Sequence, residues 1–163
     1  MDVRERVNLV DARRSIRGRS VVRRLFAMYV HELSRYTRFY TLDARGRWRP
    51  ELWRDWLGME VLEPWLFEVG GEVAGFGVVG RQPFEFMSRD RDFKVCEFFI
   101  LAGWRRRGVG MGAARGLLDL HRGGWELTVL PGNLGALAFW KRVLGTGAEE
   151  IITPGEVVFR FER

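Results

Sequence analysis

The feature that most constrains this chain is a glycine-rich turn set between an apolar segment and an amphipathic one. Residues 93–101 are rich in aromatic and β-branched side chains, which predicts a buried strand. Three consecutive arginines follow, then glycine at every second position from Gly108 to Gly112, and a helical pattern runs on to about His121. The first N–H groups of a helix lack partners and lie at its positive end, and glycine lets a ligand approach them closely. This strand, turn and helix therefore predict a binding site for a pyrophosphate.

Several kinds of site use such a turn, and its details separate them. A P-loop requires Gly-Lys-Ser/Thr, which this segment lacks. A dinucleotide-binding fold places Gly-x-Gly-x-x-Gly after its first strand. Here the turn lies two thirds of the way along the chain, and its third glycine, Gly112, comes one residue early. A third motif, Arg105-x-x-Gly108-x-Gly110 at the start of a helix, fits better.

A second pattern follows the turn. After a further strand comes Asn133-x-x-Ala136-x-x-Phe139-Trp140. The two patterns together resemble the acetyl-CoA-binding motifs of the GNAT superfamily of N-acetyltransferases, in which the second motif usually ends in Phe-Tyr. They cover roughly residues 96–144, about a third of the chain, in the family's order and spacing.

The resemblance implies an α/β (α+β) fold, with a mixed, mostly antiparallel central sheet flanked by helices and splayed between its fourth and fifth strands. The residue patterns match that topology in the order β-α-α-β-β-β-α-β-α-β-β, as a single domain over residues 1–163. Ser20 is expected to cap the first helix, which ends near Thr37, and Pro50 to begin a short helix that stops before Gly58. The expected strands are residues 7–10, 65–69, 72–79, 93–101, 125–130, 148–152 and 156–162, the second and third joined by a Gly70-Gly71 turn, and residues 80–92 are expected to form a loop.

The resemblance also implies that acetyl-CoA is the cosubstrate. Backbone N–H groups of the turn are expected to hold its pyrophosphate, and the end of the preceding strand and the last helix, from Asn133 to Leu144, to border its pantetheine arm. Asn133 is equally suited to cap that helix, and the two roles are compatible. The cofactor-binding residues so assigned are Phe99, Ile100, Leu101, Arg105, Arg106, Arg107, Gly108, Val109, Gly110, Met111, Gly112, Asn133, Phe139 and Trp140.

The proton chemistry of amine acetylation points to Glu97. An alkyl amine has a pKa of about 10.4, so it arrives protonated at neutral pH and must lose a proton before it attacks. Glu97 is the one acid in an apolar strand, where burial raises a carboxyl pKa and makes a better base. The alternatives are that Glu97 points outward or anchors a neighbouring backbone group. The base would then be water, or a carboxylate of the loop 80–92 such as Glu85.

Trp140 stands where the family often has the tyrosine that protonates departing CoA. An indole N–H donates a hydrogen bond but does not give up its proton at a useful pH. The acid is then Tyr36 or Tyr40, of which Tyr36 is our catalytic candidate. Alternatively the thiol, with a pKa of about 8.5, leaves as a thiolate and needs no acid.

Composition limits the remaining classes of site. Cys96 is the sole cysteine, which excludes an intrachain disulfide, and its apolar strand favours a buried structural thiol over a nucleophile. His31 and His121 are isolated on predicted helices, which favours surface or packing roles, so no metal is expected. No apolar run is long enough for a signal peptide or a membrane span. We expect a cytoplasmic protein, monomeric or homodimeric, without a membrane partner.

Much of the formal net charge of +6 lies near the N-terminus, where residues 1–24 hold eight arginines against three acids. A basic patch is typical of nucleic-acid binding, but these arginines lack interleaved aromatic residues, which favours a solvated surface. Two alternatives to an active enzyme remain, a catalytically silent acyl-CoA-binding or regulatory module and a nucleic-acid-binding protein. The acceptor is undetermined between a small amine, an aminoglycoside-like compound, an amino acid, and a protein N-terminus or lysine.

Overall fold

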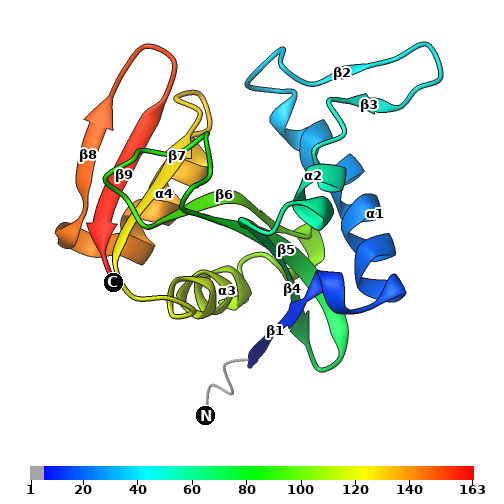
Figure 1. Cartoon of the computed structure of the whole chain (residues 1–163), viewed down its shortest axis with the longest axis horizontal. Coiled ribbons are helices and arrows are strands. Elements are labelled where there is room, and N and C mark those ends of the chain that lie inside the picture. The colour runs from blue at the N-terminus through cyan, green and yellow to red at the C-terminus, as the bar shows by residue number, and fades with distance from the viewer. Residues whose placement is uncertain (1–5) are drawn as a thin grey trace.

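A computed structural model of the chain describes residues 6–163 (Figure 1). Its strands are β1 (Val7–Asp11), β2 (Thr41–Leu42), β3 (Trp48–Arg49), β4 (Leu62–Val69), β5 (Glu72–Arg81), β6 (Phe93–Ile100), β7 (Gly124–Val129), β8 (Glu149–Ile152) and β9 (Val157–Glu162). Its helices are α1 (Ile16–Leu33), α2 (Trp53–Gly58), α3 (Val109–Leu118) and α4 (Leu134–Leu144). Within the described residues, β2 and β3 form a separate hairpin and the other strands form one sheet in the order β1-β4-β5-β6-β7-β9-β8. The predicted mixed, mostly antiparallel α/β architecture is confirmed.

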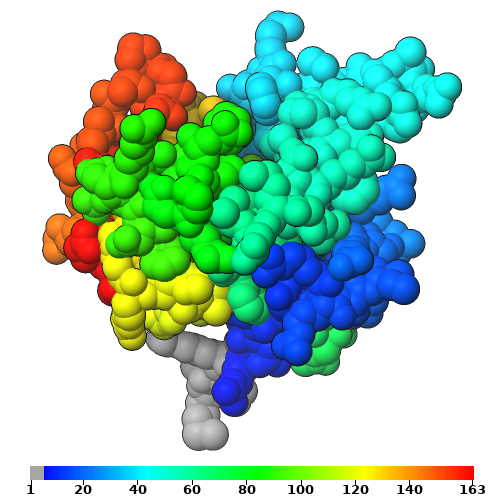
Figure 2. All heavy atoms as spheres, viewed as in Figure 1, coloured from blue at the N-terminus to red at the C-terminus, as the bar shows by residue number. Residues whose placement is uncertain are grey.

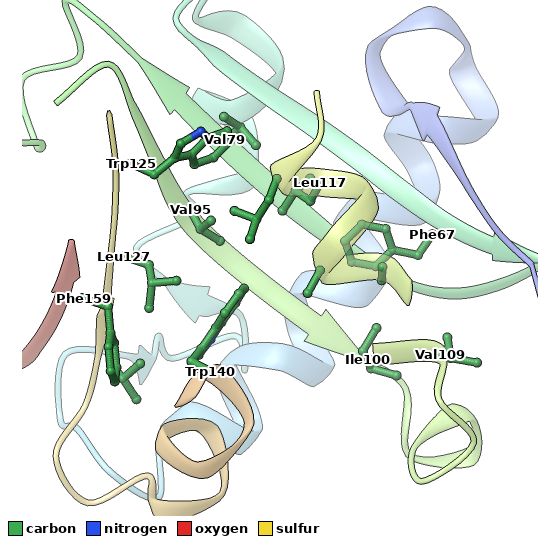
Figure 3. Close-up of a cluster of buried hydrophobic side chains, with 14 of the residues drawn as sticks. Phe67, Val79, Val95, Ile100, Val109, Leu117, Trp125, Leu127, Trp140 and Phe159 are labelled. Atoms are coloured by element: carbon green, nitrogen blue, oxygen red, sulfur yellow. The ribbon is translucent and has the colours of Figure 1, made fainter. Parts of the chain in front are cut away.

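Helices cover both faces of this sheet (Figure 1). α1 and α2 pack on one face, over a core that includes Phe26 and Trp56. α3 and α4 pack on the other face, where Leu117 lies among buried side chains of the sheet (Figure 3). Because side chains alternate along a strand, neighbours such as Leu66 and Phe67 belong to opposite cores.

The sheet parts between β6 and β7, which form the one parallel pair among the described strands. The two strands pair over three residues of each, Phe93–Val95 against Trp125–Leu127. From Cys96 to Ile100, β6 keeps pairing with β5 but has no partner in β7. These are the fourth and fifth strands of the predicted order, so the predicted splay is confirmed.

The N-terminal helices differ from the prediction at their ends. Ser15, not Ser20, caps α1, because its Oγ accepts a hydrogen bond of 2.9 Å from the Gly18 N–H. α1 ends at Leu33, and a turn over residues 34–36 replaces the predicted last helical turn. The predicted Ser20 cap is therefore wrong.

The second helix begins at Trp53, three residues after Pro50, and includes Gly58. The reason is the β2–β3 hairpin, which pairs Arg49 with Thr41 and so holds the chain beside Pro50 extended. This hairpin, coloured cyan, stands out from the body of the molecule (Figure 2). Two-residue strands carry no periodic pattern, so the sequence did not indicate it.

The remaining predicted elements are present. β4 and β5 form the expected hairpin, and Gly70 and Gly71 have φ values of +57° and +85°, which that two-residue turn requires. β8 and β9 form the C-terminal hairpin. Across the described residues, no helix combines the length and apolarity that a membrane span requires.

Candidate functional site

A cleft of about 1520 Å³ lies where β6 and β7 part. One wall comes from β6, the turn before α3, the end of β7 and the start of α4, and the other from the end of α1 and residues 34–40. Both predicted catalytic residues, Glu97 and Tyr36, are in its lining. So are ten of the fourteen predicted cofactor residues: Phe99, Ile100, Arg105, Arg106, Gly108, Gly110, Met111, Asn133, Phe139 and Trp140.

The turn before α3 presents backbone N–H groups to this cleft. Gly108 has φ +81°, a left-handed conformation that glycine adopts without strain, and it stands at the N-cap of the helix. The Gly112 N–H donates a hydrogen bond to the Gly108 carbonyl at 3.1 Å, at the first turn of the helix. The N–H groups of residues 109–111 come earlier in the chain and so have no acceptor within the helix. With the helix dipole behind them, these amides have the geometry that suits an anion, and their binding of a pyrophosphate stays a prediction.

The other two glycines of the turn, Gly110 and Gly112, allow close packing. A Cβ added to Gly110 would lie 3.3 Å from the Phe139 ring and 3.7 Å from Ile100. At Gly112 it would lie 3.1 Å from Val7 of β1. Their missing side chains therefore let α3 approach α4, β6 and β1 closely, a role that the motif alone did not indicate.

Arg105 forms hydrogen bonds to both sides of the cleft. Its Nε donates to the Ile100 carbonyl at 2.7 Å, and its Nη2 donates to both carboxylate oxygens of Glu32 at 2.9 and 2.8 Å. The guanidinium carbon also lies 5.6 Å from the centre of the Phe99 ring. The side chain thus links the end of β6 to the end of α1.

Four of the predicted cofactor residues lie outside the cleft lining: Leu101, Arg107, Val109 and Gly112. Val109, the first residue of α3, is buried in the core near Ile100 (Figure 3). The Arg107 guanidinium lies 4.4 Å from the centre of the Trp104 ring. Arg106 is exposed and lines the cleft.

A bulge in β6 decides where Glu97 points. Val78 of β5 pairs with Glu97 and the next residue, Val79, pairs with Val95, so Cys96 is an extra residue in β6. Strict alternation from Val95, which faces α3, would turn Glu97 toward α3 as well. The extra residue instead directs Glu97 to the α1 face, where Tyr29 lies.

Glu97 and Tyr29 form a hydrogen-bonded pair inside the cleft. The Tyr29 hydroxyl donates to Glu97 Oε2. Burial raises the pKa of Glu97 to about 7, although the Tyr29 hydrogen bond and the charge of Lys94 lower it. Burial and the nearby Glu97 charge raise the pKa of Tyr29 well above its ordinary value. A carboxyl group with a pKa near neutrality can take up and release a proton at physiological pH.

The other tyrosines of the cleft are Tyr40 and Tyr36. Tyr40 is buried, and burial followed by the Glu97 charge raises its pKa. Tyr36 is 39% exposed, and its ring borders Gly132 in the loop before α4, where an added Cβ would lie 3.5 Å from it. Glu85, the alternative base, is exposed in the loop after β5 and is not in the cleft lining.

Residues at the start and in the middle of α4 line the same wall of the cleft as β6. Asn133 caps the helix, its Oδ1 accepting a 3.1 Å hydrogen bond from the Ala136 N–H. Trp140 is buried and projects from α4 toward β6, with its ring 5.1 Å from the Phe98 ring in an edge-to-face arrangement (Figure 3). Phe139 stacks on Phe98 at 5.5 Å. The aromatic cluster therefore covers β6 where it has lost its partner strand.

Comparison with known proteins identifies this arrangement. The model of the acetyltransferase (GNAT) family matches residues 25–146, three quarters of the chain. The chain belongs to the GNAT acetyltransferase family. Membership supports a transferase. No curated protein matches the chain by sequence.

Solved structures agree with this GNAT fold. An acetyltransferase from Thermus thermophilus is 16% identical with a TM-score of 0.69, over 97% of both chains. A GNAT-family acetyltransferase from Streptococcus agalactiae is 12% identical with a TM-score of 0.72, over 96% of this chain and 95% of the other. A GNAT acetyltransferase from Elizabethkingia anophelis with acetyl-CoA bound is 12% identical with a TM-score of 0.51, over 70% and 83%. At these identities the likeness shows the fold alone.

Sequence reasoning missed Tyr29 and Glu32. Both lie on α1, outside the GNAT motifs, and Tyr29 reads as one apolar-face residue among several. The one available signal was the unpaired acid in β6, because a carboxylate in an apolar strand needs a donor from a neighbouring element.

Two further predictions concern Cys96 and metal ligands. Cys96 is partly rather than fully buried, beside Gly80, and burial raises its pKa to about 12, which keeps it a thiol. His121 Nε2 lies 2.8 Å from Glu63, and its ring stacks on Phe93 at 4.4 Å. Among residues 6–163, no group of His, Cys, Asp and Glu is placed to hold a metal ion. Arg4, one of the N-terminal arginines, lies outside the described residues.

Proposed function

We propose that this protein is an N-acetyltransferase that moves the acetyl group of acetyl-CoA to a primary amine by direct attack in a ternary complex. The observation that carries the proposal is the position of Glu97. The β6 bulge brings this carboxyl group into the cleft, and burial gives it a pKa of about 7. The same cleft is bordered by the glycine turn and by the parted strands.

Acetyl-CoA binding is assigned to the motif-bearing wall. The amides at the start of α3 and the exposed Arg106 would hold the phosphates. The edge of β6 from Cys96 to Ile100, which has no partner in β7, would offer backbone groups to the pantetheine amides and an N–H to the thioester carbonyl. Asn133, Phe139 and Trp140 would border the same arm.

Glu97 is the proposed base. The amine nitrogen attacks the thioester carbon, a C–N bond forms, and the C–S bond breaks as CoA leaves. The proton lost by the amine passes to Glu97, directly or through water. Because the pKa of Glu97 is about 7, a large fraction is ionised at neutral pH and can accept that proton.

Tyr36 is the proposed acid for the departing thiolate. The Tyr29 hydroxyl already donates a hydrogen bond to Glu97, and the raised pKa of Tyr40 makes Tyr40 a poorer acid. Tyr36 lines the cleft with an exposed ring near the start of α4. A thiol pKa of about 8.5 also allows CoA to leave as a thiolate, so we expect Tyr36 to assist the reaction without being essential.

Two measurements test the proposal together. Calorimetry should detect acetyl-CoA binding in the micromolar range, and release of free CoA thiol should depend on added primary amine. Binding without amine-dependent release for any amine of a broad panel would indicate a catalytically silent acyl-CoA-binding module. Absence of binding at millimolar acetyl-CoA would contradict the assignment of the glycine turn.

A further inference from the structure

Residues 34–41, which run from the end of α1 to the first residue of β2, form a second hollow beside the cleft. This hollow has a volume of about 590 Å³ and is lined entirely by that segment. It shares Ser34, Arg35, Tyr36, Thr37 and Tyr40 with the cleft lining, so the two spaces adjoin. In Figure 2 the light blue atoms of this part of the chain rise between the orange C-terminal hairpin and the cyan β2–β3 hairpin.

Among the described residues, the lining of the hollow includes two arginines and no acid. Arg35 and Arg38 both line it and both are exposed. Within residues 6–163, neither guanidinium has an ion pair or a side-chain hydrogen bond. The next acids are in the cleft, and each is engaged: Arg105 binds both oxygens of Glu32, and Tyr29 donates to Glu97.

This distribution limits the charge of an acceptor. Beyond Glu97, the two spaces offer no unengaged carboxylate to a second ammonium group. A polycationic acceptor would also meet Arg35 and Arg38, whose charges repel it. An anionic group, in contrast, finds two guanidinium groups that are free to bind it, and the guanidinium fork suits carboxylate and phosphate oxygens.

Aromatic rings line the cleft and the adjoining hollow. Phe39 lines the cleft and is 62% exposed, with its ring edge-on to Tyr40 at 5.0 Å. Tyr36, also exposed, lines both spaces. Tyr40 lies close enough to Glu97 for the carboxylate charge to act on its hydroxyl. An acceptor that reaches from the hollow to Glu97 therefore passes an aromatic wall.

We propose that the acceptor is a primary amine that also carries an anionic group, a carboxylate or a phosphate, bound by Arg35 and Arg38. The carbon skeleton of the acceptor contacts Tyr36 and Phe39, and the amine reaches Glu97. This inference rests on the proposed acetyltransferase function and specifies its substrate class. It disfavours aminoglycoside-like compounds and polyamines.

The test uses matched acceptors that differ in the anionic group alone. Phenylalanine is compared with phenylalaninamide for the carboxylate, phosphoethanolamine with ethanolamine for the phosphate, and spermidine serves as the polycation. The rate of CoA thiol release at saturating acetyl-CoA gives kcat/KM for each compound. We expect at least one anionic member to exceed its neutral partner about tenfold, the energy of one charge-assisted contact, and spermidine to be the poorest. The pair that responds distinguishes a carboxylate from a phosphate.

Arg35→Gln and Arg38→Gln should remove this preference through KM, by about tenfold for the anionic acceptor and little for its neutral partner. Arg45→Gln is the matched control. It removes the same charge from the exposed loop between β2 and β3, outside both spaces, and should change neither value.

Two outcomes separate the claims. Turnover that favours spermidine or is indifferent to the anionic group would overturn the substrate class while leaving the acetyltransferase function in place. Absence of turnover with every amine would overturn the function itself. Calorimetric titration of the CoA-bound protein with phenylalanine and phosphoethanolamine gives an independent readout. Binding of neither compound at millimolar concentration, or binding unaffected by Arg35→Gln, would overturn the substrate class whatever the turnover.

Discussion

The two walls of the cleft present different kinds of chemical groups. The wall formed by the glycine turn, β6 and α4 offers mainly backbone groups, fixed by Gly108 at positive φ and by the parting of β6 from β7. The opposite wall, from α1 and residues 34–41, offers side chains such as Tyr29 and Arg35. Backbone recognition requires glycines and exact spacing, which leave a motif in the sequence. Side-chain recognition leaves single residues that no spacing marks.

The largest effect should come from Glu97→Gln, at the point where the two walls meet. Loss of a general base costs roughly 100-fold in rate, so kcat should fall by about that factor, most at low pH where the amine is fully protonated. Acetyl-CoA affinity should change less than twofold, because the backbone wall is untouched. Steady-state kinetics and calorimetry measure the two quantities. A variant that turns over like the parent from pH 6 to 9 would contradict the assignment of the base.

Glu97→Gln should also change how stability depends on pH. The folded-state pKa of Glu97, about 7, lies above its ordinary value, so its stabilising contribution is complete below that ordinary value and is lost as pH rises through 7. Glutamine, like the protonated carboxyl group, is uncharged, so the variant does not lose this stability as pH rises. The variant should therefore gain on the order of 2 kcal/mol relative to the parent between pH 5 and pH 8, visible as a relative rise in Tm. If the difference in Tm between the variant and the parent is the same at pH 5 and pH 8, Glu97 is solvated.

Gly108→Ala tests the backbone wall alone. A side chain at φ +81° costs about 1–2 kcal/mol, so the turn should distort and acetyl-CoA affinity should fall about tenfold. Gly103→Ala is the control, because Gly103 has no positive φ and an added Cβ there meets nothing within 4 Å. Equal losses in both variants would argue that the turn does not hold the cosubstrate.

Tyr29→Phe tests the side-chain wall. Its hydroxyl lowers the pKa of Glu97, so removal should move the rising limb of kcat/KM to higher pH, by about one unit for a hydrogen bond to a charged group. Activity near pH 7 should then fall by about five- to tenfold and recover at higher pH. Tyr36→Phe should leave that rising limb in place. A pH-independent loss in Tyr29→Phe would indicate a purely structural role.

The smallest effect should come from Trp140→Phe. The indole packs edge-on against Phe98 and donates no proton, so its replacement should raise KM for acetyl-CoA about threefold and leave kcat nearly unchanged. The kinetics of the variant over pH 6–10 measure both constants. A selective fall in kcat, with loss of a falling limb, would show that Trp140 takes part in protonating CoA after all.

The sequence predicted the C-terminal half well and the N-terminal half in part. From β6 to α4, glycines and periodic apolar residues determine the elements, and the splay followed from the family resemblance. In the N-terminal half, the α1 cap was misplaced because Ser20 and Ser15 are both plausible caps, and tertiary contacts choose between them. The partner of Glu97 was missed because a hydrogen bond between residues 29 and 97 depends on packing across the sheet, which no local pattern records.

The bulge at Cys96 implies that the site is sensitive to an insertion in the neighbouring strand in a way that substitution does not reveal. Inserting one residue between Val78 and Val79 of β5, opposite Cys96, would restore regular pairing and turn the Glu97 carboxyl group toward α3, away from Tyr29. Every chemically important side chain would still be present, yet the base would lie on the wrong face of the sheet. Any transplantation of this site to another strand must therefore carry the additional residue along with the glutamate.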